Sequence, residues 1–387
     1  MSLPAHPPPR SPLDRHRQLA PSAAVRVSPL CLGTMNFGDA WKDWLGECPK
    51  DTAFEILDNF VSQGGNFIDT ASNYQNEESE KWIGEWITKR QNRDELVLAT
   101  KYSSSYKNHE TGKIHSNYGG NSAKSMRVSL ESSLQKLQTS YIDLFYIHFW
   151  DYTVSIPELM HSLNDLVVSG KVIYLGISDT PAWVVAKANQ YARDHGLRQF
   201  TVYQGLWNAS IRDFEREILP MCRDENMGLI PWGTLGQGRF HTEAGYKERE
   251  QNNNHSGRKG QPATEVEKRV SKTLETIADS KKTDLTSVAL AYVRHKAPYV
   301  FPIVGGRKLE HLRSNIAALE VSLSGEEVRQ IEAAYDFDYG FPHTFLSGSL
   351  FDGSSPRAPN GPADVWLTKL MGNFDWVQPE QPIERTQ

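Results

Sequence analysis

The chain has 387 residues and a formal net charge of -5, with 39% apolar and 23% charged residues, which is an ordinary globular composition. It has no excess of positive charge for nucleic-acid phosphates, and no apolar run approaches the roughly 18 residues needed to cross a bilayer. We therefore expect neither a nucleic-acid partner nor a membrane-embedded protein.

The first 24 residues contain six prolines among scattered charges. Such a segment buries little apolar surface, so we expect residues 1–24 to form a disordered or surface-wrapped arm outside the fold. The N-terminus also lacks the apolar run of a signal peptide, and the three cysteines Cys31, Cys48 and Cys222 are widely spaced and odd in number. These features favour a reducing, cytoplasmic setting.

Beyond residue 24, short apolar runs alternate with longer segments in which apolar residues recur every three or four positions. The short runs predict buried strands, and the longer segments predict helices with one apolar face, as at Ile56, Leu57 and Phe60. Eight strand-then-helix units close into a barrel more readily than they form an open sheet, so we predict a (β/α)8 TIM barrel over residues 25–335. The predicted strands cover residues 29–32, 66–68, 96–100, 142–147, 172–177, 200–204, 228–231 and 299–303.

Two segments do not fit the repeating strand-helix plan. Residues 236–263 are rich in Gly, Asn, Lys and Glu, and residues 336–387 are rich in Gly, Ser and Pro. Long segments of this kind in a compact domain are usually lids or disordered loops. We expect the second one to form a C-terminal extension over or beside the barrel.

Ionisable residues follow three successive predicted strands, at the end of a barrel where active sites lie. Asp69 follows the second strand with Tyr74 in the next loop, Lys101 ends the third strand, and His148 ends the fourth. Each residue alone has an ordinary structural explanation, such as a helix cap for Asp69 or a packed side chain for Tyr74. Four of them at one barrel mouth favour a catalytic site, because burying unpaired charges is costly.

The ordinary acidities of these groups suggest a reaction. A phenol with a pKa of about 10 is a poor acid at neutral pH, and we expect the Lys101 ammonium to lower the pKa of Tyr74. Asp69 would pair with Lys101, and a neutral His148 would donate a hydrogen bond to a substrate oxygen. Such a site suits protonation of a carbonyl oxygen while hydride is delivered to the carbon. No side chain donates hydride, so we expect a nicotinamide cofactor and a small carbonyl or alcohol substrate.

The second half of the barrel offers groups for that cofactor. Polar donors and acceptors at the ends of strands five and six suit a carboxamide, and Trp232 offers a flat face for a nicotinamide ring. After the eighth strand, two glycines and two cations precede a helix, which suits phosphate binding. No GxGxxG sequence follows an early strand, which disfavours a Rossmann domain. The predicted cofactor contacts are Ser178, Asp179, Gln204, Trp232, Gly305, Gly306, Arg307 and Lys308.

Several motifs together resemble the aldo-keto reductase superfamily over residues 28–335. They include GGNFIDTASNYQNEESEKWIGEW, LATK, YIDLFYIHFWD, GKVIYLGISD, TVYQGLWN and IVGGRKLEHLRSN. The segments LCLGTMNFGDAWKDWLG and PWGTLGQGRF resemble the fungal branch of aryl-alcohol dehydrogenases and norsolorinic acid reductases. The resemblance implies Tyr74 as general acid and base with Asp69, Lys101 and His148, and it adds His311 and Asn315 to the cofactor contacts.

Two positions depart from the pattern of the resembling family. Asp179 stands where many members have Asn, which alters the carboxamide contact. His311 stands where many members have Arg near the 2'-phosphate, so Arg307 and Lys308 would carry more of the preference for NADP(H) over NAD(H).

The loops over the barrel mouth are rich in aromatic residues, which favours flat, aromatic aldehydes or ketones as substrates. The aromatic residues in these loops are Phe37, Trp41, Trp44, Phe149, Trp150 and Trp207, of which we predict Trp41, Phe149 and Trp150 to contact substrate. The family resemblance adds a second physiological role, the reduction of a polyketide ketone in fungal secondary metabolism.

Three other classes of protein remain as alternatives. The family resemblance allows a redox-sensing regulatory subunit that binds cofactor with little turnover. Lys101 at a strand end allows a Schiff-base aldolase, although a lysine paired with Asp69 stays charged while an amine nucleophile must be neutral. A metal hydrolase is disfavoured because one histidine and one carboxylate lack a third ligand, and we assign no metal site.

Overall fold

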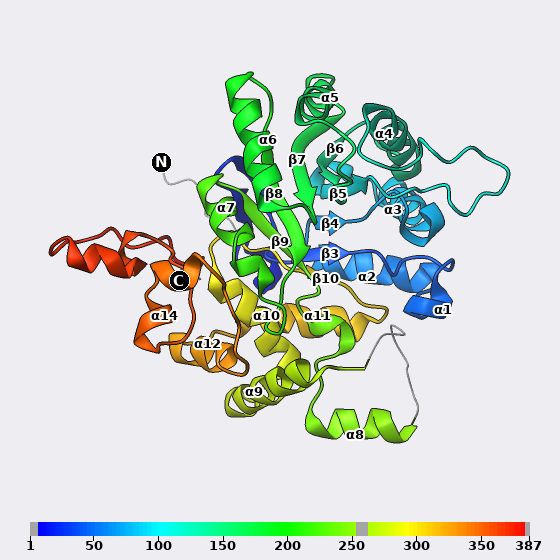
Figure 1. Ribbon diagram of the computed structural model, residues 1–387. Coiled ribbons are helices and arrows are strands. Elements are labelled where there is room, and N and C mark those ends of the chain that lie inside the picture. Colours follow the sequence, from blue (N-terminus) through cyan, green and yellow to red (C-terminus); the bar gives the residue numbers. More distant parts are fainter. Residues whose placement is uncertain (1–6, 253–261, 384–387) are drawn as a thin grey trace, which may run out of the picture.

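The computed structural model describes residues 7–252 and 262–383 and confirms the predicted (β/α)8 barrel (Figure 1). The parallel strands form one sheet in the order β10-β3-β4-β5-β6-β7-β8-β9. The sheet closes because Leu229 pairs with Val300, and the Leu229 amide donates to the Tyr299 carbonyl at 2.9 Å. The barrel strands are β3 (Cys31–Gly33), β4 (Phe67–Asp69), β5 (Val97–Tyr102), β6 (Ile142–Ile147), β7 (Val172–Ser178), β8 (Phe200–Leu206), β9 (Gly228–Trp232) and β10 (Ile303–Val304).

Helices surround the barrel and turn their apolar faces toward it. In α2 the buried positions are Ala53, Ile56, Leu57 and Phe60, which is the stripe that the sequence spacing predicts. The helices around the barrel and beside it are α2 (Lys50–Ser62), α3 (Glu78–Arg90), α4 (Ala123–Leu137), α5 (Ile156–Val168), α6 (Ala182–Asp194), α7 (Ile218–Asp224), α9 (Glu265–Lys281), α10 (Leu285–Lys296), α11 (Leu309–Ala317) and α12 (Gly325–Glu332).

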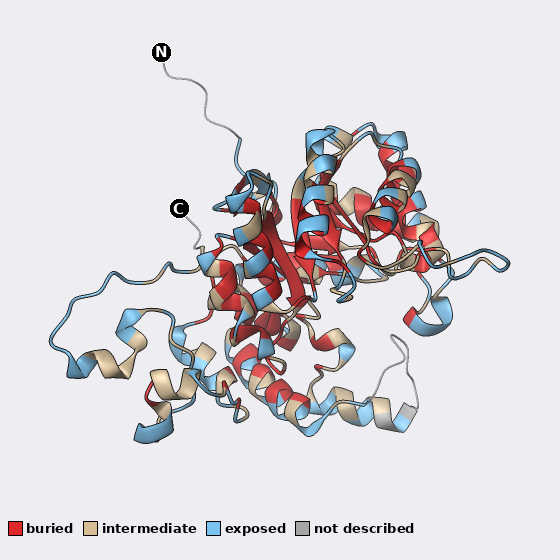
Figure 2. Cartoon of the chain, turned by 45° about the horizontal axis from the view of Figure 1, so that its top comes forward, coloured by how far each residue is buried: buried red, intermediate tan, exposed pale blue. Residues whose placement is uncertain are grey.

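The buried residues form two layers, which appear as the red centre of Figure 2. One cluster lies between the sheet and the helices and includes Leu98, Phe145 and Leu163. The other fills the barrel itself and includes Tyr146 and Phe301. The three cysteines are all buried and free. In the described chain no helix is long and apolar enough to span a bilayer.

The N-terminal segment differs from the expected arm. Within the described residues, Arg17–Ala20 (β1) and Ala23–Val27 (β2) form an antiparallel hairpin, so a domain boundary at residue 24 falls inside a strand. Leu19 is fully buried in the cluster that fills the barrel. Pro21 lies in the tight turn between the strands, a position that its fixed φ suits, rather than in a disordered tract. Leu19 contacts Gly228, the first residue of β9, so the hairpin covers the end of the barrel opposite the mouth.

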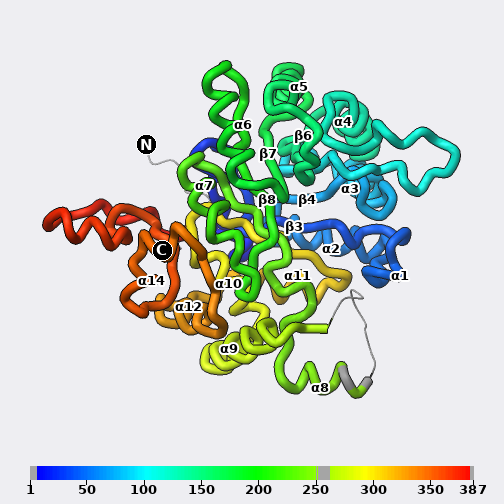
Figure 3. Tube along the Cα trace, in the orientation of Figure 1, coloured from blue at the N-terminus to red at the C-terminus, as the bar shows by residue number. Residues whose placement is uncertain are grey.

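The two segments outside the plan are ordered where the structure describes them. Residues 236–252 include the helix α8 (Glu243–Asn252), whereas residues 253–261 lie outside the described residues. Residues 333–383, after α12, run beside α7, as Figure 3 shows. Arg216 donates to the Asp338 carbonyl, and Arg223 donates to the Asn360 side chain at 2.6 Å. The extension therefore lies beside the barrel.

Candidate active site

The carboxyl ends of three neighbouring strands bring the predicted ionisable residues together. Asp69 ends β4, Lys101 lies in β5, and His148 directly follows β6. The Lys101 ammonium lies 2.5 Å from an Asp69 carboxylate oxygen and donates to the Thr70 carbonyl at 2.8 Å. The Lys101 side chain is 0% exposed. Separating this pair would leave an uncompensated buried charge, so its geometry is strongly held.

Tyr74 reaches the same place from the loop after β4, where it begins the 3-10 turn η2 (Tyr74–Glu77). The three residues after it all have left-handed backbone angles. The buried Gln75 side chain holds this unusual loop, because it accepts from the Trp41 amide at 2.6 Å and donates to the Met35 carbonyl at 2.9 Å. The Tyr74 hydroxyl consequently lies 3.5 Å from the Lys101 ammonium.

The structure corrects the electrostatic expectation for Tyr74. Burial raises the pKa of the Tyr74 hydroxyl because the tyrosinate would lose its hydration, and the Asp69 carboxylate adds to this increase. The Lys101 ammonium opposes the increase but does not cancel it. Lys101 by itself lowers the pKa of Tyr74, as the sequence suggests, but burial outweighs this effect, so Tyr74 is held in the protonated form that donates a proton.

Lys101 is charged at neutral pH, whereas His148 is neutral. Burial alone would lower the pKa of the Lys101 ammonium, but the Asp69 carboxylate raises it above its ordinary value. A permanently charged ammonium is a poor nucleophile, which argues against the aldolase alternative.

Burial, aided by Lys101, lowers the pKa of His148 to about 3, so this imidazole is neutral. Its Nδ1 pairs with the Ser104 hydroxyl at 3.2 Å, and its ring centroid lies 5.8 Å from that of Tyr74. Nε2 is thus available to a ligand oxygen beside the Tyr74 hydroxyl.

The ends of β7, β8 and β9 form the opposite wall of the site. The Gln204 amide donates to the second Asp69 oxygen at 3.0 Å, which ties this wall to the ion pair. The Asp179 carboxylate accepts from the Ser178 hydroxyl at 3.2 Å and from the Trp232 indole N–H at 3.3 Å. The structure therefore brings together these four predicted cofactor contacts, with Ser178 buried beneath the wall.

The turn after β10 leads into the N-terminus of α11, where the helix dipole and free amides favour an anion. A methyl group on Gly306 would lie 2.7 Å from the His311 side chain, so glycine keeps this turn open. Burial, together with Arg307 and Lys308, lowers the pKa of His311 and leaves it neutral beside two cations. The open turn and its charge are suited to a phosphate group.

One cleft of about 1040 Å3 connects these parts of the site. This volume is at the upper end of the range for cofactor and ligand pockets, and an extended dinucleotide fits such a cleft. Lys101 and Ser178 lie beneath its surface. The predicted site residues that line it are Asp69, Tyr74, His148, Asp179, Gln204, Trp232, Gly305, Gly306, Arg307, Lys308, His311 and Asn315.

The cleft also has walls that the sequence reasoning missed. Phe240, His241 and Arg249 line it from the segment that contains α8, and Met35 and Leu45 line it from the loop after β3. Residues 236–263 are identifiable as a candidate lid by their length, but α8 is polar on all sides and has no apolar face. Periodicity therefore provides no signal for the individual residues that face the cleft.

The predicted substrate aromatics do not line the cleft. Phe149 is exposed beside His148, while Trp150 is half-buried and packs against the core. Trp41 packs its ring edge against Tyr74, with a centroid distance of 6.3 Å. Phe37 and Trp207, also in these loops, are fully buried core residues. Aromatic density in the sequence thus overstates the aromatic surface offered to a ligand.

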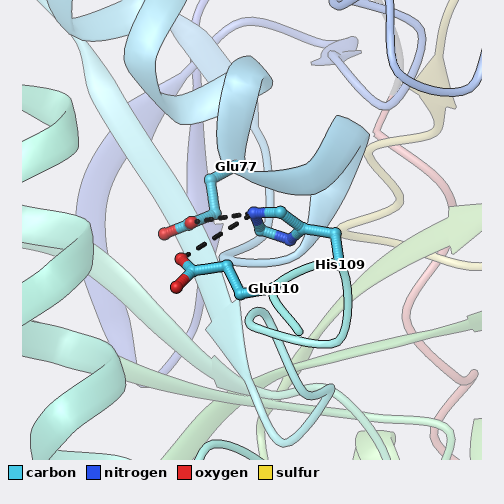
Figure 4. Close-up of side chains that lie close together, drawn as sticks. All are labelled: Glu77, His109 and Glu110. Carbon is cyan, nitrogen blue, oxygen red and sulfur yellow. Dashed lines mark ion pairs between the residues drawn. The ribbon is translucent and has the colours of Figure 1, made fainter. Parts of the chain in front are cut away.

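A second cluster of ionisable residues lies outside the cleft (Figure 4). Glu77, His109 and Glu110 have the spacing of metal ligands. Lys107, however, lies 2.7 Å from Glu77 and 2.8 Å from Glu110. Lys136 also pairs with Glu77, and Lys113 with Glu110, so ammonium groups already balance both carboxylates. We therefore assign this cluster a structural role in the loop after Tyr74.

Comparisons with known proteins agree with this geometry. The sequence pattern described as the Aldo/keto reductase family matches residues 29–336. The chain is 67% identical to norsolorinic acid reductase B of Dothistroma septosporum, over 95% of this chain and 93% of that protein. It is 62% identical to norsolorinic acid reductase B of Aspergillus parasiticus, over 96% of this chain and 97% of that protein.

A further relative is the aryl-alcohol dehydrogenase [NADP(+)] of Phanerodontia chrysosporium, 48% identical over 93% of this chain and 96% of that protein. The family pattern, these relatives and the barrel agree with one another. The chain belongs to the aldo/keto reductase family and is an oxidoreductase.

Proposed function

We propose that this enzyme reduces the carbonyl group of an aromatic aldehyde or ketone to an alcohol, with NADPH as hydride donor and Tyr74 as proton donor. The observation that carries the proposal is the Tyr74 hydroxyl 3.5 Å from a fully buried Lys101 ammonium, which is itself paired with Asp69. In this position Tyr74 can give up a proton to a substrate oxygen, because the adjacent cation stabilises the tyrosinate that forms.

The other side chains of the site have complementary roles. Asp69 holds Lys101 in place from one oxygen and accepts from Gln204 with the other. Neutral His148 donates to the carbonyl oxygen and orients it toward Tyr74. In the direction of alcohol oxidation, the same residues act in reverse, with the tyrosinate as base.

The cofactor assignment rests on the walls of the cleft. A bound nicotinamide supplies the hydride that no side chain can donate. Trp232 offers a flat face near Tyr74, and the open turn at Gly306 with Arg307 and Lys308 suits a charged phosphate. These cations favour NADP(H) over NAD(H), and one relative carries NADP(+) in its name.

The substrate class has two candidates. Leu45, Met35 and Trp232 give the cleft an apolar character that suits flat aromatic rings. Aryl aldehydes are our first candidate, in line with the aryl-alcohol dehydrogenase relative. The second candidate is a ketone of an aromatic polyketide, which the two norsolorinic acid reductases at 67% and 62% identity favour.

The test compares wild type with Tyr74→Phe, and with Tyr152→Phe as control because that tyrosine is 69% exposed. Dinucleotide binding is followed by quenching of tryptophan fluorescence, and turnover by NADPH consumption with benzaldehyde-type aldehydes, aliphatic aldehydes and aromatic ketones. We expect Tyr74→Phe to lose about 10²–10⁴-fold in kcat while it still binds NADPH, because only the proton transfer is removed. A kcat for Tyr74→Phe equal to that of the wild type would contradict the proposed role of Tyr74.

Tight NADPH binding by the wild type without turnover of any carbonyl in the panel would instead support the redox-sensing alternative. Equal turnover of aliphatic and aromatic aldehydes would contradict the proposed substrate class.

A further inference from the structure

Asp179 has an unusual backbone conformation at the wall of the cleft. It directly follows β7 with a φ of 44°, in the left-handed region that costs free energy for residues other than glycine. Its amide donates to the Gln204 carbonyl at 3.1 Å. The next residue is clamped as well, since the Tyr203 hydroxyl accepts from the Thr180 amide at 3.0 Å and donates to the Thr180 carbonyl at 2.7 Å. The fold therefore holds the Asp179 side chain at a defined place in the cleft.

The hydrogen-bond partners of this carboxylate are both neutral. One oxygen accepts from the Ser178 hydroxyl and the other from the Trp232 indole N–H. Burial raises the pKa of Asp179, and Lys101, which opposes this from across the site, is already paired with Asp69. The Asp179 side chain is exposed to the open cleft, so a ligand that fills the cleft would displace its water. A carboxylate that loses its water without a cation of its own is costly, so this wall of the cleft is suited to a positively charged ligand group.

The position of Asp179 indicates which group that is. If Tyr74 protonates a carbonyl oxygen, the hydride donor must lie close enough to reach the adjacent carbon. The nicotinamide ring would then lie between Tyr74 and the Trp232 face, and Asp179 is bonded to the edge of that indole. The Asp179 charge also contributes to the raised pKa of Tyr74, which shows that its field reaches the reacting end of the cleft.

We propose that the Asp179 carboxylate sets the redox preference of the bound cofactor, by stabilising the cationic oxidised nicotinamide over the neutral reduced ring. This inference rests on the proposed function, because it assumes the nicotinamide at this end of the cleft. The enzyme then binds NADP+ more tightly than an otherwise identical site without the charge. Tighter binding of the oxidised form makes the bound cofactor a stronger hydride donor, which favours carbonyl reduction.

The substitution Asp179→Asn isolates the charge. Asparagine has nearly the same shape and is one of the few residues that adopt the left-handed region readily, so the fold is retained. We expect the ratio of the dissociation constants, Kd for NADPH over Kd for NADP+, to fall about 10-fold in this variant. That change corresponds to a shift of about 30 mV in the midpoint potential of a two-electron couple.

Glu310→Gln is the matched control, because Glu310 lines the same cleft from the first turn of α11, just after the open turn at Gly306. This substitution removes the same charge as Asp179→Asn, but NADP+ and NADPH differ in charge only at the nicotinamide ring and not at their phosphates. Both dissociation constants are measured by isothermal titration calorimetry, and circular dichroism verifies that each variant is folded. We expect the Kd ratio of Glu310→Gln to match that of the wild type.

An unchanged ratio in Asp179→Asn, in protein that binds both dinucleotides, would overturn this inference and leave the proposed function intact. A fall of equal size in Glu310→Gln would overturn it too, because the effect would then be one of general charge. Failure of the wild type to bind either dinucleotide would overturn the proposed function itself.

Discussion

Asp69 and Asp179, two carboxylates at the mouth of the barrel, differ in role because their partners differ. Asp69 is paired with a buried ammonium that holds it in place. Asp179 accepts from two neutral donors and remains open to the cleft. Asp69 therefore positions Lys101, whereas Asp179 presents its negative charge to the cleft. Only the contacts of the two residues distinguish these roles.

His148 gives a prediction for stability at the residue scale. Its pKa is lowered from 6.5 to about 3, first by burial and then by Lys101, so the folded state holds it neutral while the unfolded state takes up a proton as the pH falls. The stabilisation is fully present above pH 6.5 and is lost as the pH falls from 6.5 toward 3. Between about pH 7 and about pH 5 we expect a loss of about 2 kcal/mol from this group.

Urea unfolding of wild type and His148→Gln at these two values of pH measures that loss. The variant lacks the titrating group, so its free energy of unfolding should fall less over the same interval. Parallel losses in the two proteins would show that His148 is not held neutral.

At the scale of elements, the N-terminal hairpin is the largest difference between expectation and structure. Prolines before residue 13 and at Pro21 suggest disorder, but the strand pair contributes Leu19, Ala20, Ala23 and Val27 to the barrel interior. A methyl group on Gly228 would lie 2.4 Å from the Leu19 carbonyl, so the hairpin backbone and β9 are in direct contact. The hairpin thus covers one end of the core inside the barrel.

The hairpin predicts a stability effect without a direct catalytic one. Leu19 is 0% exposed, and its truncation in Leu19→Ala should lower the free energy of unfolding by about 2–5 kcal/mol by leaving a cavity. The control Arg26→Ala changes an exposed residue of the same hairpin and should alter stability by no more than about 0.5 kcal/mol. Both variants should keep the kcat/KM of the wild type at temperatures where they are folded. If Leu19→Ala lowered the free energy of unfolding no more than Arg26→Ala, the hairpin would not be part of the barrel core.

At the scale of the whole molecule, one buried carboxylate joins the C-terminal extension to the barrel. Glu215 accepts from Tyr339 of the extension at 2.8 Å and from the Tyr292 hydroxyl of α10 at 3.1 Å. Arg212 and Lys296 neutralise it at 2.9 Å and 3.1 Å, and these cations help lower its pKa to about 2 although burial alone would raise it. The extension is consequently part of the folded unit.

Tyr339→Phe tests this junction. It removes a donor to the buried Glu215 carboxylate and an acceptor for the Arg212 guanidinium, so we expect the free energy of unfolding to fall by about 1–3 kcal/mol. Tyr335→Phe is a matched control, because the Tyr335 hydroxyl is buried without a hydrogen-bond partner and its removal breaks no bond. Dinucleotide affinity should not change in either variant, since among the described residues none that lines the cleft follows Asn315. Equal stability of the two variants would show that the junction does not anchor the extension.

The sequence alone determined the barrel, because strand and helix periodicities are local patterns and parallel strands with crossover helices allow few closed arrangements. It also predicted which residues meet at the mouth, since Asp69, Lys101 and His148 each follow a strand and all strands end on the same side. The hairpin was not predictable, because it packs on parts of the chain that are remote in sequence, as Leu19 does on Gly228.

Only the tertiary structure decided how the site behaves. The pKa of Tyr74 depends on the balance between burial and a cation 3.5 Å away, and spacing in the chain gives neither the depth nor the distance. The same holds for Asp179, whose neutral partners come from its neighbour Ser178 and from a strand some fifty residues on. Electrostatic effects fall off with distance through space and grow with desolvation, and both quantities exist only once the chain has folded.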